Sequence, residues 1–218
     1  STMEQILQVL KSGEPTAILL AGSSLMEPGL VAASRISETA QVRLIAETFP
    51  PRLQRGAGLP ALDRLMYLAE FAQMQLDGLK HLILVGAASP VSFFAYPEIA
   101  SDLVPQGCAV HVLAHPGDDS TGALEELAVM LGAPADAAVL AAPSRPEKPS
   151  GVLNPESFAA AIGALLPEDV IVVDEGNTAG LFVAGFTAGA PRHDWLCLPG
   201  GAIGFGMPVA TGAAVASP

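Results

Sequence analysis

The stretch that decides the fold is TAILLAGSS at residues 16–24, an apolar run that ends in a glycine-containing polar turn. The same pattern returns as HLILVG at 81–86, and further apolar runs stand at 42–46 and 109–113. Short apolar runs closed by turns are typical of strands buried on both faces of a parallel sheet. Segments with apolar residues at helical spacing separate these runs, at residues 4–11, 28–36, 62–76 and 121–131. This alternation predicts an α/β domain over residues 1–135, a Rossmann-like parallel sheet with helices on both faces.

A proline-rich segment follows this domain. Residues 142–151, APSRPEKPSG, carry prolines at 143, 146 and 149 and show no hydrophobic periodicity. We therefore expect an extended, exposed linker at residues 136–153. Asn154 and Pro155 then form an N-cap followed by proline in the first turn of a helix. Residues 154–218 are expected to form part of a second α/β domain, truncated after its first strands.

The most distinctive segment is the glycine-rich loop LPGGAIGFGMP at residues 198–208. Glycine lets a backbone approach a flat ligand closely and adopt conformations closed to residues with a Cβ. Ile203 is the branched apolar residue among these glycines, and Pro208 can open a helix because its missing N–H needs no partner there. The small residues at 209–216 predict a helix buried against a sheet. We interpret the segment as a ligand-binding loop; alternatively, Ile203 packs under a helix.

This loop resembles the segment that holds the aminopyrimidine ring in thiamine-diphosphate-dependent 2-oxo-acid enzymes, the family of acetolactate synthase, benzoylformate decarboxylase and pyruvate decarboxylase. A second match lies upstream, where the apolar run at 170–173 ends in the turn DEGNT at 174–178. The resemblance implies that Ile203 sits beneath the bent cofactor. It also implies that the Gly201 carbonyl accepts from the amino group of the ring, that the Ile203 N–H donates to a ring nitrogen, and that the upstream turn reaches the diphosphate.

Seven cofactor-binding residues are implied by the resemblance: Glu175, Gly176, Asn177, Thr178, Gly201, Ala202 and Ile203. Glu175 leaves the subclass open. Benzoylformate decarboxylase has a glutamate in the matching turn, whereas acetolactate synthases have an apolar residue at that position.

The order of the two domains is similar to the central domain and the start of the diphosphate-binding domain of this family. The resemblance implies a fragment of an acetolactate synthase large-subunit-like enzyme, a transferase that decarboxylates pyruvate and joins the product to a second 2-oxo acid. A benzoylformate- or pyruvate-decarboxylase-like lyase is the alternative. The family's activating glutamate and its ligands for Mg²⁺ lie in segments that this sequence does not contain. We therefore expect no catalytic residue, no metal ligand and no activity in the chain alone, and a homo-oligomer, dimer or tetramer, for the full-length protein.

A nucleotide site in the first domain is a further possibility. The turns at 22–24 and 86–90 end parallel strands, where ligands bind in open α/β sheets. By resemblance, the central domain binds FAD in acetolactate synthases and ADP in some relatives. Neither turn reads G-x-G-x-x-G, and no acidic residue stands where a ribose would need one, so FAD lacks support here. A nucleotide- or CoA-binding regulatory module, or an inactive scaffold paralogue, is the alternative of another class.

Composition narrows the partners and the compartment. A net charge of −12 argues against nucleic acid, whose phosphates need a basic surface. No apolar run approaches the roughly 18 residues of a membrane span, and the N-terminus shows no secretory signal. The chain's cysteines, Cys108 and Cys197, form no C-x-x-C motif. These features favour a cytoplasmic protein, and the resemblance implies a small-molecule 2-oxo-acid substrate.

Three further features have mainly structural interpretations. His81 and His111 open or lie within predicted strands, show no metal-ligand spacing, and are expected to be hydrogen-bonded structural residues. The loop with Arg52 and Arg55 is interpreted as solvated, with phosphate binding as the alternative. The aromatic run FFAYP at 93–97 is interpreted as a loop at the domain edge or a subunit interface.

Overall fold

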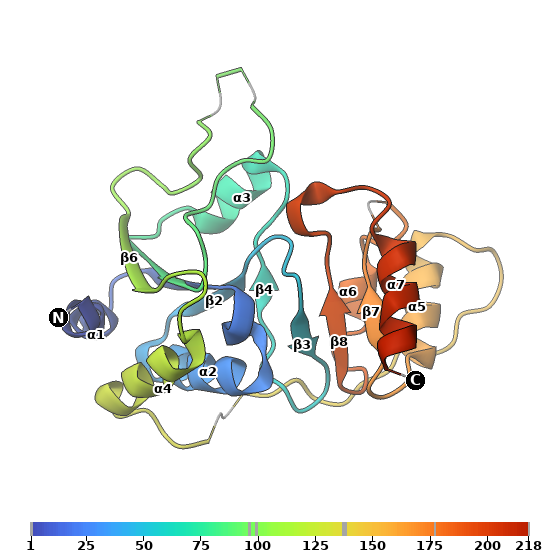
Figure 1. Ribbon diagram of the computed structural model, residues 1–218, viewed down its shortest axis with the longest axis horizontal. Coiled ribbons are helices and arrows are strands. Elements are labelled where there is room, and N and C mark those ends of the chain that lie inside the picture. The colour runs from blue at the N-terminus through green and yellow to red at the C-terminus, as the bar shows by residue number, and fades with distance from the viewer. Residues whose placement is uncertain (1, 96, 99, 137–138, 177, 218) are drawn as a thin grey trace. The chain divides into compact units, whose positions relative to one another are not determined.

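The computed structural model (Figure 1) describes residues 2–217 apart from 96, 99, 137–138 and 177. The chain forms two compact units. Unit 1 comprises Ser1–Thr48 and Leu62–Ala138, and unit 2 comprises Phe49–Ala61 and Val139–Pro218. Residues 49–61 thus belong to the second unit although the chain before and after them belongs to the first, and no local sequence pattern predicted this. The assignment of the two units to named domains of an enzyme family stays a prediction.

Unit 1 is built on a five-stranded sheet. Its strands are β1 (Thr16–Leu20), β2 (Arg43–Ala46), β4 (Asp63–Arg64), β5 (His81–Val85) and β6 (Ala109–Ala114). They lie in the order β4-β2-β1-β5-β6, and every pair is parallel. All five residues of β1 are buried, because β2 and β5 flank its edges and helices cover the two faces to which its side chains point. The predicted parallel α/β fold is therefore confirmed.

Helices cover both faces of this sheet. They are α1 (Thr2–Ser12), α2 (Glu27–Ala40), α3 (Ala69–Leu76) and α4 (Ser120–Leu131). Figure 1 shows α3 on one side and α2 and α4 on the other. Alternate residues of the central strands serve the two faces: Leu19 and Leu82 pack with Ala72 and Leu76 of α3, whereas the intervening residues point to the opposite face.

The helix predicted over 62–76 is wrong in its first half. Asp63 and Arg64 form the edge strand β4, paired with Ile45 and Ala46, and the helix begins only at Ala69. Leu65 is buried directly after this strand, whereas Met66 and Leu68 are exposed. The apparent helical spacing combined residues that belong to a strand, a loop and a helix.

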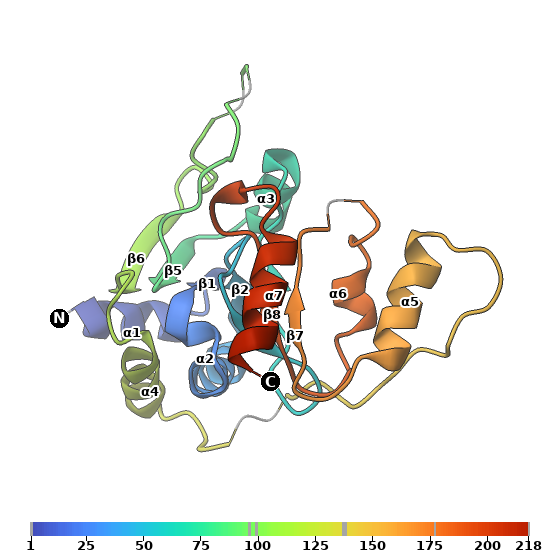
Figure 2. The ribbon, with the colours of Figure 1, turned by 45° about the vertical axis from the view of Figure 1, so that its right-hand side comes forward.

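Unit 2 contains a three-stranded sheet of β3 (Leu53–Arg55), β8 (His193–Leu196) and β7 (Ile171–Val173), in that order. β7 runs parallel to β8, and β3 pairs with β8 in the antiparallel sense. The helices are α5 (Pro155–Leu165), α6 (Val183–Phe186) and α7 (Gly206–Ala216). Figure 2 shows α7 alongside β7, and α6 next to α5.

The ends of two helices in unit 2 follow from their sequences. Asn154 caps α5 as predicted: its Oδ1 accepts the Ser157 N–H, and Ser157 Oγ accepts the Asn154 N–H, both at 2.8 Å. Pro208 lies in the first turn of α7, also as predicted. However, none of the described residues of α7 is buried, so the expectation of a helix buried against a sheet is wrong for this chain.

The segment between the predicted domains forms neither helix nor strand in its described part, residues 136 and 139–153. Residues 139–153 belong to unit 2 and are hydrogen-bonded to the rest of it. The Ser144 N–H donates to the Gly189 carbonyl at 2.8 Å, and the Arg145 guanidinium donates to the Ala164 and Leu166 carbonyls, each at 2.8 Å. Arg145 therefore satisfies carbonyl groups at the C-terminal end of α5, which have no partner within the helix itself.

Within the described part of the chain, no helix combines the length and the apolar character needed to cross a bilayer. Cys108 and Cys197 are both thiols.

Candidate functional site

The turn that follows β7 is tied to the sheet of unit 2 by Asp174. Its Oδ2 accepts the indole N–H of Trp195 at 3.1 Å, and Trp195 is a buried residue of β8. Its Oδ1 accepts the Gly176 N–H at 2.9 Å, and its own N–H donates to the Leu196 carbonyl at 2.8 Å. Three hydrogen bonds from one residue fix where the turn leaves the strand.

The glycine-rich loop runs from the 3₁₀ turn Pro199–Gly201 to the start of α7. Gly201 and Gly204 have φ angles of +71° and +93°, a region that L side chains rarely adopt. A Cβ built on either residue would meet no atom within 4 Å. Backbone conformation, and not crowding, is therefore the reason for glycine at these two positions.

Glu175 connects the turn to the loop. Its carboxylate accepts the backbone N–H groups of Gly204 and Gly206, which lie at the N-terminal end of α7. These backbone donors, with a smaller contribution from the Phe205 N–H, hold the pKa of Glu175 below its ordinary value. A Cβ on Gly206 would lie 2.7 Å from Glu175 Oε2, so glycine there lets the carboxylate approach without shifting.

The residues implied to bind a cofactor lie on these two connected segments. Gly176 and Thr178 are exposed on the turn, and Gly201 and Ala202 are exposed on the loop. Ile203 presents 86% of its surface to solvent. Asn177 lies outside the described residues. Ile203 is not packed under a helix of this chain, and its exposure leaves a branched apolar side chain available to a ligand.

The loop fits the heteroaromatic part of thiamine diphosphate. Space around Gly201 and Gly204 is open to 4 Å, and the exposed Ile203 side chain offers an apolar surface on which a flat ring can rest. The diphosphate is an anion, so fewer residues of these two segments are suited to bind it. A glutamate carboxylate only accepts hydrogen bonds when ionised, so the Glu175 side chain cannot hold an anion. Among the described residues of the turn, Thr178 has a hydroxyl donor for that role, whereas the Gly176 N–H already donates to Asp174 Oδ1.

Arg52 and Arg55 have partners within unit 2. The Arg52 guanidinium lies 2.7 Å from Asp194 Oδ2, and this contact raises its pKa. Arg55 donates to the Ala184 carbonyl and stacks 4.8 Å from the ring centre of Trp195. Arg52 is exposed, as a solvated loop requires, but Arg55 belongs to β3 and supports the strand that carries Trp195.

The two turns that could have formed a nucleotide site in unit 1 differ: the turn at Gly86 is closely packed, whereas a Cβ on Gly22 would meet no atom within 4 Å. A Cβ on Gly86 would lie 2.7 Å from the Ala21 carbonyl oxygen and 2.8 Å from Ser120 Oγ, so the end of β5 adjoins the end of β1 and the start of α4.

One acidic residue was missed in this region. Glu47 directly follows β2. Burial raises the pKa of its carboxyl group, and the hydrogen bond from the Gly22 N–H partly offsets this rise. Its position directly after an apolar run was the available signal.

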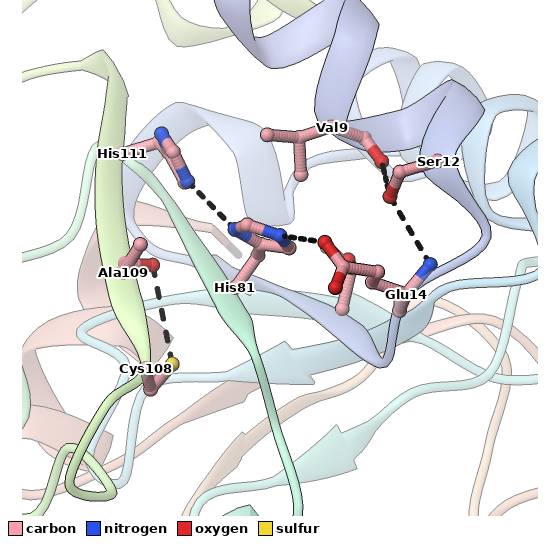
Figure 3. Close-up of polar contacts among 8 residues, drawn as sticks. Val9, Ser12, Glu14, His81, Cys108, Ala109 and His111 are labelled. Atoms are coloured by element: carbon pink, nitrogen blue, oxygen red, sulfur yellow. Dashed lines mark hydrogen bonds and ion pairs between the residues drawn. The ribbon is translucent and has the colours of Figure 1, made fainter.

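A polar cluster joins the end of α1 to strands β5 and β6 of unit 1 (Figure 3). His81 Nδ1 lies 3.0 Å from His111 Nε2, and His81 Nε2 lies 2.9 Å from Glu14 Oε2. Burial, and then the neighbouring His81, lower the pKa of His111. The prediction that both histidines are hydrogen-bonded is confirmed. No group of three or more His, Cys, Asp or Glu among the described residues has the geometry of a metal site.

The aromatic run at 93–97 is exposed in its described part. Phe93 and Phe94 lie with their ring centres 5.3 Å and 5.9 Å from that of Tyr67. Tyr96 lies outside the described residues.

Comparison with solved structures gives the class of fold. Over 98% of the chain, the structure is similar to 44% of a chain described as a "putative thiamin diphosphate-dependent enzyme" from Mycobacterium smegmatis, with a TM-score of 0.63 and 18% identity. It is similar over the same shares to benzoylformate decarboxylase from Polynucleobacter necessarius, with a TM-score of 0.66 and 16% identity. The fold is therefore that of the matching segment of thiamine-diphosphate-dependent enzymes.

Comparison with curated sequences gives a nearer relative. The chain is 57% identical over 212 residues to the "Putative acetolactate synthase large subunit IlvX" of Mycobacterium tuberculosis. This match covers 96% of the chain but 40% of the relative, so the chain spans less than half the length of the protein it matches. No protein-family model matches the chain. The resemblance to acetolactate synthase large-subunit-like proteins of the thiamine-diphosphate-dependent family is confirmed.

Proposed function

We propose that this chain forms part of a thiamine-diphosphate-dependent enzyme that acts on a 2-oxo acid, and that unit 2 contributes one side of the cofactor site. The observation that carries the proposal is the hydrogen bonding of Glu175, which connects the two segments that resemble the family's cofactor-binding motifs. The identity to an acetolactate synthase large-subunit-like protein supports carboligation after decarboxylation of pyruvate. A decarboxylase-like lyase reaction is the alternative, supported by the glutamate at position 175.

Within this proposal, each segment has a separate task. Gly201, Ala202 and Ile203 would hold the aminopyrimidine ring, with the Ile203 side chain beneath the cofactor. Gly176 and Thr178, with Asn177, would lie at the diphosphate. When bound, the cofactor accepts the electron pair released as CO₂ leaves the substrate. The chain's own contribution is to bind and orient the cofactor. We assign no proton-transfer residue or metal ligand to it.

The remaining parts of the proposal concern the complete protein. Mg²⁺ would bridge the diphosphate through ligands outside this chain, the full-length enzyme would be a homo-oligomer, and the location would be cytoplasmic. The chain alone would release no CO₂ from pyruvate. FAD is not included, because neither turn at the strand ends of unit 1 reads G-x-G-x-x-G.

The proposal is tested by nuclear magnetic resonance of the ¹⁵N-labelled chain with three ligands. Thiamine diphosphate with Mg²⁺ should shift amide signals at both 176–178 and 201–203. Thiamine, which lacks the diphosphate, should shift only the second group, and inorganic pyrophosphate only the first. Ile203→Ala should reduce the response to thiamine. Shifts confined to unit 1, or no shift at millimolar ligand, would contradict the proposed site.

The reaction is tested with the complete enzyme. Pyruvate, thiamine diphosphate and Mg²⁺ should yield CO₂ and a carboligation product in which the two-carbon remainder of one pyruvate is joined to a second pyruvate. Release of acetaldehyde in place of that product would favour the lyase alternative. Release of CO₂ by the 218-residue chain alone would contradict its expected inactivity.

A further inference from the structure

We infer that Glu175 is a positioning residue that acts through the backbone of the glycine-rich loop and does not itself touch the cofactor. Insofar as this loop binds the cofactor, the inference rests on the function proposed above. Glu175 follows β7, whereas of the groups that it binds, Gly206 opens α7 and Gly204 lies in the loop just before it. A single side chain thus joins the end of a strand to the start of a helix.

The chemistry of the contact determines what the carboxylate can do. Both of its oxygens accept backbone N–H groups, Oε1 from Gly204 and Oε2 from Gly206. The first N–H groups of a helix have no partner within the helix and carry a partial positive charge, so an anionic acceptor is favoured there. An ionised carboxylate occupied in this way has no donor to offer a ligand, and its charge would repel a diphosphate.

Residues on both sides of the contact between Glu175 and the glycine-rich loop favour that contact. Gly206 has no Cβ, and a Cβ there would lie 2.7 Å from Oε2 and 3.2 Å from the Glu175 Cβ. Asp174, the preceding residue, is bound to Trp195 and to the Gly176 N–H, which fixes the backbone from which Glu175 extends. Glu175 therefore extends from backbone that is fixed to the sheet, and its carboxylate reaches the loop at Gly206, where no Cβ is in the way.

The consequence concerns Ile203. This residue directly precedes Gly204, and its side chain is almost fully exposed, so no packing within unit 2 holds it in place. The hydrogen bond at Gly204 is the adjacent restraint on its backbone. Loss of the carboxylate would let the loop sample other conformations, and the fraction competent to bind a flat ring would fall. A fall of that fraction to about one tenth weakens apparent affinity about tenfold.

The test uses the Gly204 and Gly206 amide signals of the ¹⁵N-labelled chain, with no cofactor present. In the wild type, both signals should titrate together at a midpoint below the ordinary glutamate pKa of 4.5, because the backbone N–H groups favour the ionised form. Glu175→Gln should move both signals and remove their titration. Gly206→Ala, which keeps the carboxylate but crowds it, should raise the midpoint observed at Gly204.

Glu168→Gln is the matched control, because Glu168 is an exposed carboxylate just before β7. It should leave both amide signals in place. Far-ultraviolet circular dichroism checks that each variant keeps its secondary structure. Unchanged Gly204 and Gly206 signals in Glu175→Gln, or a wild-type midpoint at or above the ordinary glutamate value, would overturn the inference.

A thiamine titration separates this inference from the proposed function. Weaker binding to Glu175→Gln, by about tenfold at residues 201–203, supports the positioning role. Equal binding by wild type and variant would overturn that role while leaving the cofactor site intact. Absence of thiamine binding to the wild type, together with the expected pH titration of the two amides, would contradict the proposed function and retain Glu175 as the residue that orders the loop.

Discussion

Unit 1 and unit 2 are both α/β assemblies, but they differ in how far they bury their strands. In unit 1, every residue of β1 is buried between flanking strands and helices on two faces. In unit 2, the three residues of β7 are only partly buried, and α7 buries none of its described residues. The same alternation of strand and helix therefore produces a closed core in one unit and an open surface in the other. The segments that resemble a cofactor site belong to the open one.

This difference predicts where a core truncation will have its largest effect. Leu82 of β5 is fully buried and contributes to the cluster between the sheet and α3. Leu82→Ala should reduce the free energy of unfolding of unit 1 by about 2–5 kcal/mol, because the side chain leaves a cavity that its neighbours fill only in part. Urea unfolding followed by circular dichroism measures this loss.

Val215→Ala on α7 provides the matched truncation in unit 2. Val215 is 78% exposed, so its replacement should change the free energy of unfolding by less than about 0.5 kcal/mol. Equal losses for Leu82→Ala and Val215→Ala would show that α7 is covered in solution, and the contrast between the units would not hold.

The contrast also explains which parts of the structure could be predicted from sequence. The strands at 16–20 and 81–85 were identified because burial on both faces makes every position apolar, a local signal. β3 was missed because its partner lies far along the chain: Leu53 pairs with Trp195, and no local pattern reports such a pairing. The expectation that α7 is buried was wrong, because small residues permit close packing but do not provide another element for the helix to pack against.

The candidate site shows the same limit. The turn and the loop were both identified from residue types, since glycine and apolar residues at fixed spacing are visible in the sequence. The contact that joins them was not identified, because Glu175 could be weighed only as a direct ligand. A carboxylate at a strand end and a Gly-x-Gly at a helix start, residues 204–206, were the available signals.

A smaller effect is expected at the junction of the linker segment with unit 2. Arg145→Ala removes the donors to the Ala164 and Leu166 carbonyls and should reduce the stability of unit 2 by about 1 kcal/mol. Trp195 is the only tryptophan of the chain and lies in unit 2, so its fluorescence follows this unit. Lys148→Ala removes a nearby exposed positive charge and is the control. A loss of equal size in both variants would assign the effect to charge and not to the carbonyl contacts.

The histidine cluster predicts a modest pH dependence in unit 1. Burial lowers the pKa of His111, so below the ordinary histidine value of 6.5 the unfolded chain binds more protons than the folded one. The stability contributed by neutral His111 should therefore be complete above pH 6.5 and decline as the pH falls from there through the lowered pKa. His81 is its hydrogen-bonded neighbour, Glu14 is bonded to His81 in turn, and Lys80 and Cys108 lie at the same sheet end.

Thermal unfolding by circular dichroism between pH 8 and pH 5 measures this dependence. His111→Gln keeps a polar side chain that does not titrate and should flatten the decline relative to wild type. An identical decline in both proteins would show that other groups control the acid response of unit 1.

The smallest expected effect on stability is at Ile203. Its side chain is 86% exposed, so Ile203→Ala should change the free energy of unfolding of the chain by less than about 0.5 kcal/mol. Ile18→Ala, at a fully buried isoleucine of β1, should by comparison cost about 2–5 kcal/mol. Urea unfolding of both variants, followed by circular dichroism, makes the comparison. A substitution that is silent for folding but weakens thiamine binding would assign Ile203 to the ligand site. A loss above about 1 kcal/mol would instead mean that Ile203 is packed in solution, because truncations at exposed positions rarely cost so much.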